Sequence, residues 1–171
     1  MIRRLRSALI AGVLGSAALL LSSCTVPHPS ITFYGDRAAV TVEPELWCTV
    51  NTAALTVECP PGAQDSGNDG TLTMGPDKPL QINVPGDVAE APWFVTFAYR
   101  DAAGKVQTER SPVISDGRLS YTLPSRGPRT QLIRVEVDSG LVPTQAANGS
   151  TVINASRVWV LAINPKAAPE Q

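Results

Sequence analysis

The chain has 171 residues, with 14 basic and 15 acidic side chains and a formal net charge of −1 at pH 7. This balance, without a Lys/Arg cluster beyond the first residues, argues against a nucleic-acid partner. Proline and glycine are frequent, at 15 and 13 residues, and they interrupt the chain at short intervals. Such punctuation favours short strands and turns over long helices.

The N-terminal residues have the layout of an export signal. Met1 to Arg6 carry three arginines, and the fifteen residues from Ser7 to Leu21 carry no charge. As a helix, this run would span roughly 22 Å at about 1.5 Å per residue, which is short of the roughly 30 Å hydrocarbon core of a bilayer. We therefore expect a cleaved signal peptide over residues 1–23 and no permanent membrane span.

A cysteine stands where the uncharged run ends, and the junction Leu21-Ser22-Ser23-Cys24 resembles a bacterial lipobox. The resemblance implies that the Cys24 thiol is joined to a diacylglycerol and that Cys24 becomes the first residue of the mature chain. Two acyl chains anchor a protein stably, whereas one chain holds it marginally. We therefore expect lipid attachment at the extracytoplasmic face of the cell membrane. The alternative is a cysteine that merely follows a cleaved signal.

The mature chain has the size of one domain. Removal of residues 1–23 leaves 148 residues, with 11 basic against 15 acidic side chains. That length is enough to bury a substantial core, and it is short for a two-lobed solute-binding protein. We expect a lipidated tether over residues 24–30, a domain over residues 31–164 and a C-terminal tail over residues 165–171.

Alternation of apolar and polar residues predicts short strands in seven segments, with a hairpin turn at Asp101 to Gly104. These segments predict an all-β, antiparallel sandwich, which over residues 79–164 resembles an immunoglobulin-like or fibronectin type III domain in size and strand spacing. Residues 31–59 are either further strands of this sandwich or a β subregion pinned by a disulfide. Flexible connections are expected at residues 60–70 and 143–150. The seven segments are residues 31–34, 38–42, 80–84, 93–99, 119–123, 132–137 and 158–163.

Two further cysteines, Cys48 and Cys59, are placed symmetrically about Ala53 and Ala54. If the chain folds back at these alanines, the cysteines lie opposite each other, where side chains of a hairpin are close. A disulfide is therefore expected in an exported protein, and two separate buried thiols are the alternative. A zinc site is not expected, because the sequence has a single histidine and no other ligand cluster near the pair.

No arrangement of residues in the sequence predicts catalysis, a metal or a cofactor. His28, the sole histidine, falls in the tether between two prolines, where we expect no scaffold to hold it against a nucleophile. Glu136 and Asp138 share one face of a strand with Arg134, and we expect this face to be solvated because the intervening valines face the core. The chain is therefore not expected to be an enzyme.

Two segments have apolar residues on both faces of a predicted strand. In residues 93–99 the second face includes Phe94, and in residues 158–163 it includes Trp159. Either loops of the protein cover these second faces, or another protein does. Phe94 and Trp159 are therefore the candidate contacts for an unidentified partner in the cell envelope.

Several short motifs together resemble the actinobacterial lipoproteins catalogued as domain of unknown function 2771. The resemblance implies a location in the envelope and no known activity. We therefore expect a non-catalytic binding or envelope-assembly module; the alternatives are a carboxylate-dependent envelope enzyme and an accessory substrate-capture subunit of a transporter. The motifs are Phe33-Tyr34, the pair Cys48 and Cys59, Val84-Pro85, Val88-Ala89 and Pro92-Trp93.

Overall fold

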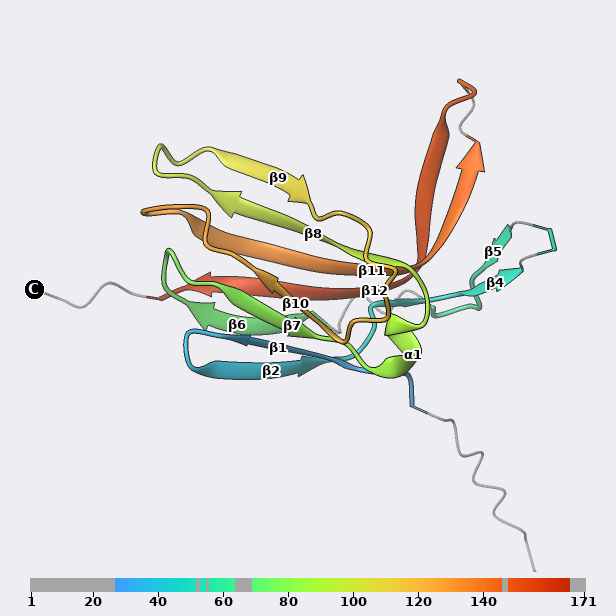
Figure 1. The fold of residues 1–171 in the computed structure, drawn as a ribbon, viewed down its shortest axis with the longest axis horizontal. Coiled ribbons are helices and arrows are strands. Elements are labelled where there is room, and N and C mark those ends of the chain that lie inside the picture. The colour runs from blue at the N-terminus through green and yellow to red at the C-terminus, as the bar shows by residue number, and fades with distance from the viewer. Residues whose placement is uncertain (1–26, 52, 55, 64–68, 146–147, 167–171) are drawn as a thin grey trace, which may run out of the picture.

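The computed structural model describes residues 27–51, 53–54, 56–63, 69–145 and 148–166, so Cys24 and the predicted signal peptide lie outside the described residues. The described chain is nearly all β, as predicted (Figure 1). Within these ranges, no helix is long and apolar enough to cross a membrane. The elements are β1 (Ile31–Gly35), β2 (Ala38–Val42), β3 (Leu46–Trp47), β4 (Thr49–Asn51), β5 (Thr56–Glu58), β6 (Gly70–Met74), β7 (Leu80–Asn83), α1 (Gly86–Ala89), β8 (Trp93–Arg100), β9 (Val106–Arg110), β10 (Ser120–Leu123), β11 (Gln131–Gln145) and β12 (Thr151–Pro165).

The first sheet of the sandwich has the strand order β10-β7-β1-β2, with antiparallel neighbours. Its alternation follows the sequence pattern, because Ile31 and Phe33 are buried while Tyr34, which points to the opposite face, is exposed. The turn that joins β1 to β2 holds Asp36 and Arg37 at positive φ. This sheet supplies one wall of the core.

The second sheet has the order β3-β12-β11-β8-β9, and β6 also pairs with β12. The β6 pairing is parallel, whereas an antiparallel sandwich was expected. β3 pairs with residues 157–158 of β12, and β6 pairs with residues 161–165, so the two short strands share one edge. The specific immunoglobulin-like or fibronectin type III arrangement is not confirmed.

The core lies between the two sheets and continues beneath α1. Its largest fully buried side chains are Trp93, Trp159, Phe33 and Phe97. The short helix adds Val88 and Ala89 to the same cluster, and it closes one end of the sandwich. We call this the tether end, because residues 27–30 enter the domain there (Figure 1).

The first strands settle the open question about residues 31–59. β1 and β2 are strands of the main sandwich, whereas β4 and β5 form a separate two-stranded sheet. β1 also lies between β7 and β2, so residues 79–164 do not contain a complete sandwich by themselves. The core therefore depends on residues 31–59 as well as on residues 79–164.

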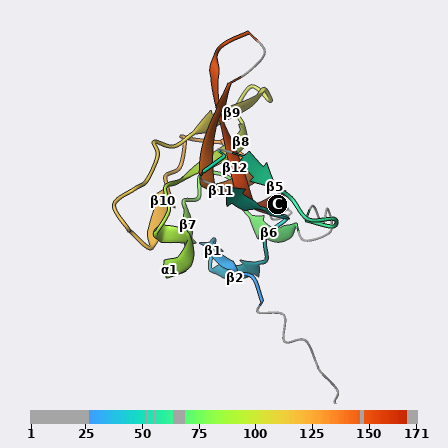
Figure 2. The same cartoon turned by 90° about the vertical axis from the view of Figure 1, so that its right-hand side faces the viewer.

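The longest strands, β11 and β12, extend well beyond their predicted limits. The segment 143–150 was expected to be a flexible connection, but β11 continues to Gln145 and β12 begins at Thr151. Beyond Ser139 this pair leaves the sandwich as a two-stranded projection, which we call the arm (Leu141–Gln145 with Thr151–Ala155). Figures 1 and 2 show the arm and residues 27–30 at the same end of the molecule, on opposite sides of it.

Candidate functional site

The hairpin of β4 and β5 is closed by the predicted disulfide between Cys48 and Cys59. The register pairs Thr49 with Glu58, which places the two cysteines opposite each other with their Cα atoms 4.4 Å apart. The chain reverses near Ala53 and Ala54, as their central position predicted, and both of their backbone N–H groups donate to the Asn51 side chain. The hairpin is thus an independent, covalently closed unit.

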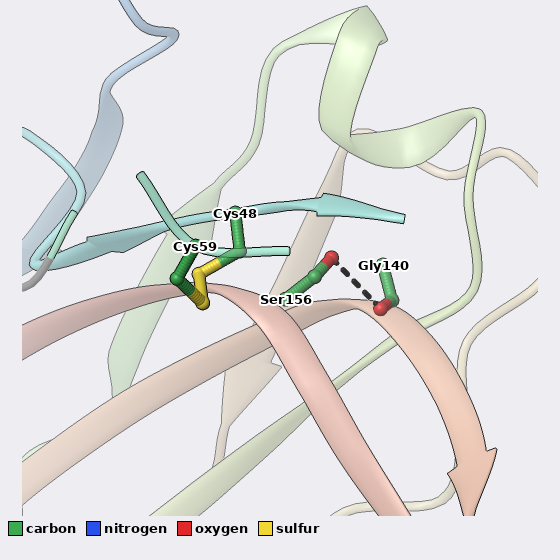
Figure 3. The surroundings of a disulfide bond; sticks show 4 residues. All are labelled: Cys48, Cys59, Gly140 and Ser156. Carbon is green, nitrogen blue, oxygen red and sulfur yellow. Dashed lines mark hydrogen bonds between the residues drawn. A yellow bond between two sulfur atoms is a disulfide. The ribbon is translucent and has the colours of Figure 1, made fainter. Parts of the chain in front are cut away.

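This hairpin is attached to the base of the arm. The backbone N–H of Cys48 donates a 2.8 Å hydrogen bond to the carbonyl of Ser156. The Ser156 hydroxyl in turn donates to the carbonyl of Gly140, 2.9 Å away on the facing strand (Figure 3). Gly140 has φ +63°, and a Cβ there would lie 2.1 Å from the Ser156 Oγ. The arm therefore leaves the sandwich at a point that only glycine fits.

The tether is held against the domain by an aromatic cluster. The Trp159 Nε1 donates a 2.9 Å hydrogen bond to the carbonyl of Pro29. His28 stacks on Trp47, with ring centroids 4.5 Å apart, and Trp47 meets Trp159 edge-on at 6.1 Å. The indole of Trp47 thus provides a platform for the imidazole, which local sequence did not indicate.

A surface hollow of about 510 Å³ lies beside this cluster, and we call it the tether hollow. The Arg157 guanidinium lies over the Trp47 ring, 4.5 Å from its centroid. Asp87 and Glu90, from α1 and the residue after it, bring two carboxylates to the same hollow. None of the lining residues carries a hydroxyl or a thiol. The lining consists of Pro27, His28, Pro29, Trp47, Asp87, Glu90 and Arg157.

Behind the hollow, a row of polar atoms lacks partners. The register places Trp93, Ser139, Arg157 and Trp47 side by side on β8, β11, β12 and β3. Among the described residues, the buried Trp93 Nε1, Ser139 Oγ and Arg157 Nε have no hydrogen-bond partner. Buried polar groups in folded proteins are nearly always satisfied, so this row indicates a place where water or a ligand completes the hydrogen bonding.

The structure corrects the assignment of Phe94 and Trp159 as partner contacts. Trp159 has no exposed surface and belongs to the core. Phe94 is 6% exposed, and the Arg110 guanidinium lies 4.8 Å from its ring centroid. Phe94 on the outward face of β8 is thus covered by Arg110 of the neighbouring strand β9, whereas covering by loops was the first alternative, and the Trp159 face of β12 is the core face itself.

The charged face of β11 is less solvated than predicted. Val135 and Val137 are buried in the core as expected, but Asp138 on the other face is only 6% exposed. Burial, and then the nearby Glu136 carboxylate, raise the pKa of Asp138 to about 7, although Thr96 donates a 3.1 Å hydrogen bond to it. This carboxyl therefore titrates near neutral pH, far above the ordinary range of an aspartate.

The Arg134 side chain extends across the neighbouring strand β12. Its guanidinium reaches Glu136 at 3.5 Å on its own strand, and Asp69 at 3.8 Å and Glu45 at 4.0 Å on the far side of β12. The side chain therefore crosses the outward face of β12, where Val160 is fully buried. Neither Glu136 nor Asp138 lines the tether hollow. No group of three potential metal ligands occurs within the described ranges.

The arm exposes apolar side chains at the tether end. Val152 and Ile153 are 42% and 43% exposed, whereas Val142 on the opposite strand is buried. The sequence from Ser139 to Ser156 contains no charged residue. Residues 143–150 of this run were expected to be a flexible connection. The absence of charged residues from the whole run was the sequence signal for an unusual surface.

The fold and these features define a class of protein: a β-sandwich with a disulfide-closed hairpin, an N-terminal segment packed against the domain and a projecting two-stranded arm. The chain belongs to the family described as Protein of unknown function (DUF2771), which matches residues 25–164. It is 32% identical over 116 residues to the uncharacterized proteins Rv0875c of Mycobacterium tuberculosis and Mb0899c of Mycobacterium bovis. The match covers 67% of this chain and 65% of each relative, just under two thirds of their length. No solved structure matches the chain.

Proposed function

We propose that the protein is a lipid-anchored, extracytoplasmic binding module that is held in the membrane by Cys24 and captures a strand of another envelope protein along its arm. The observation that carries the binding proposal is the arm itself. It projects from the sandwich, exposes Val152 and Ile153, and carries no charge. The anchoring part rests on the resemblance of residues 21–24 to a lipobox.

The arm offers backbone groups as well as side chains. The pairing of β11 with β8 ends at Ser139, and the pairing of β12 with β3 ends at Arg157. In the arm, each strand therefore pairs only with the other among the described strands. An extended peptide can add to such an edge through main-chain hydrogen bonds. Proteins usually protect free edges with charged side chains, and this arm has none.

A carboxylate-dependent envelope enzyme is the second candidate, favoured by the raised pKa of Asp138. A carboxyl that titrates near neutral pH is suited to general acid catalysis. The binding module has better support, because Asp138 is buried beneath neighbouring side chains and lines none of the hollows at the tether end.

The binding proposal is tested by placing a photocrosslinking amino acid at Ile153 of the full chain in its native cell envelope. We expect a covalent adduct with one defined protein, and the crosslinked peptide should be an extended segment. The matched control is the same substitution at Val113, which is equally exposed, at 43%, but lies on the sandwich outside the arm. Equal adducts from both positions, or no adduct from Ile153, would contradict the proposal.

A second variant separates binding from folding. Val152→Asp together with Ile153→Asp places two charges on the free edge. Because both side chains are exposed, the unfolding midpoint should change little, while the adduct formed from a crosslinker at Thr151 should disappear. An adduct between two copies of the chain would show that the arm mediates self-association, and it would contradict the capture of another envelope protein.

A further inference from the structure

The position of the tether limits how far the domain lies from the membrane. His28 and Pro29 are fixed on the domain by the Trp47 stack and the Trp159 hydrogen bond. Cys24 precedes Pro27 by three residues, which can span at most about 11 Å when fully extended. Pro27 itself lines the tether hollow. If Cys24 carries a lipid, as the proposed function states, the tether hollow lies at the level of the lipid headgroups.

The charges of the hollow are arranged in two groups. Arg157 supplies a cation on β12, and its guanidinium forms no ion pair within the described part of the chain. Asp87 and Glu90 supply two carboxylates from the helix side, and these too are unpaired among the described residues. A ligand with one anionic and one cationic group matches this arrangement.

The row of unpartnered atoms behind Arg157 points to a hydrogen-bond acceptor. Trp93 and Ser139 are completely buried, and each has a polar atom without a partner among the described residues. Ser139 pairs with Arg157 on β12 and with Trp93 on β8, so the three residues lie side by side on the same face of the sheet. Neither residue has exposed surface or lines the hollow, so Arg157 is the member of this row that can donate to a ligand there, and such a ligand must present oxygen atoms to it.

From this geometry we infer that the tether hollow binds the zwitterionic headgroup of a phospholipid in the membrane that holds the protein. The phosphate oxygens accept hydrogen bonds from the Arg157 guanidinium, whose planar donors fit phosphate. The ammonium group pairs with Asp87 and Glu90. The Trp47 and His28 rings line the hollow beside these charges. Tryptophan is enriched at membrane interfaces, where one end of its side chain is in an apolar setting and the other is wet. Binding of this kind holds the domain in one orientation on the bilayer.

The test uses the full lipidated chain in vesicles of phosphatidylethanolamine with phosphatidylglycerol, compared with vesicles of phosphatidylglycerol alone. The readout is quenching of tryptophan fluorescence by neutral acrylamide, and subtraction of a Trp47→Phe variant isolates the signal of Trp47. Because a bound headgroup covers the hollow, we expect about a twofold weaker quenching of Trp47 when phosphatidylethanolamine is present.

A charge variant provides the matched control. Asp87→Asn with Glu90→Gln removes both carboxylates at exposed positions, so its unfolding midpoint should be unchanged while the difference between the two vesicle types is lost. Equal quenching of the unmodified chain in both vesicle types, with the lipid on Cys24 verified by mass, would overturn headgroup binding and leave the anchor intact. A chain without lipid on Cys24 would instead overturn the proposed function.

Discussion

The indole nitrogen of Trp159 donates a 2.9 Å hydrogen bond to the backbone carbonyl of Pro29, which lies 130 residues earlier in the chain. Trp159 is fully buried and also meets the edge of the Trp47 ring. One residue therefore serves both the core and the attachment of the N-terminal segment. The tether leaves the domain from a fixed point beside the aromatic cluster.

Two substitutions at Trp159 separate these roles. Trp159→Phe keeps an aromatic ring in the core but removes the donor to Pro29, and it should lower the free energy of unfolding by about 1 kcal/mol. Trp159→Ala also leaves a cavity, and it should cost about 3–5 kcal/mol. Urea denaturation of both variants measures the two costs. An alanine variant as stable as the unmodified protein would show that Trp159 is not a core residue.

Loss of the disulfide should destabilise the hairpin of β4 and β5 and its attachment to Ser156. In the chain-entropy model, closing a loop with a sequence separation of 11 residues contributes about 3 kcal/mol. We expect a Cys48→Ser, Cys59→Ser variant to unfold at correspondingly lower denaturant concentration. Peptide mapping without reduction provides the direct check, and two freely alkylated thiols in protein taken from cells would contradict the bridge.

The raised pKa of Asp138 predicts a pH-dependent stability. The carboxyl titrates near pH 7 in the folded protein and near 3.8 ordinarily. The folded state therefore holds its proton more tightly, so this contribution to stability is fully present below about pH 4 and is lost as pH rises through 7. Asp138→Asn should avoid this loss and be more stable at pH 8, by at most about 4 kcal/mol for a pKa raised from 3.8 to about 7.

Asp116→Asn is the matched control for that measurement. The Arg118 guanidinium donates a hydrogen bond to the Asp116 carboxylate and lowers the pKa of that carboxyl to about 2. Asp116 is therefore charged throughout the range in which Asp138 titrates. Thermal unfolding between pH 4 and pH 8 should show the altered slope in Asp138→Asn alone. The same slope in the unmodified protein and in Asp138→Asn would contradict the assignment.

Alanine should destabilise the protein more at Gly140, at the base of the arm, than at Gly149. Gly140 has φ +63° and a Cβ there would meet the Ser156 Oγ, whereas Gly149 has φ +79° with no atom within 4 Å of the Cβ position. Gly149→Ala should cost about 1 kcal/mol through backbone strain alone. Gly140→Ala should cost clearly more, as measured by urea denaturation. Equal costs would mean that the Ser156 contact does not constrain the bend.

Local pattern was sufficient to predict much of the sandwich. Alternation in residues 31–34, 38–42 and 93–99 identified strands that the structure contains, because each has one face against the core. The central position of Ala53 and Ala54 identified the disulfide hairpin for the same local reason. β6 was missed, since its place on the edge of β12 depends on a partner about 90 residues away in the chain.

The features at the tether end depend on tertiary contacts that alternation does not encode. Nothing local to His28 indicates that it stacks on Trp47, and nothing local to Asp138 indicates its burial. The apolar second faces of β8 and β12 were visible in the sequence. Which face of each strand packs in the core, and which group covers the other face, was not visible, because Arg110 and Arg134 reach the outward faces only once the strands have paired.

The proposed lipid anchor on Cys24 underlies both the proposed function and the headgroup proposal, and an intact mass measurement tests it most directly. Protein extracted from cell membranes with detergent should have the mass of a chain that begins at Cys24, increased by a thioether-linked diacylglycerol. Cys24→Ala should remove that mass increase and the retention in the membrane fraction. A membrane-bound mature chain that begins elsewhere, or that carries a free thiol at Cys24, would contradict the account.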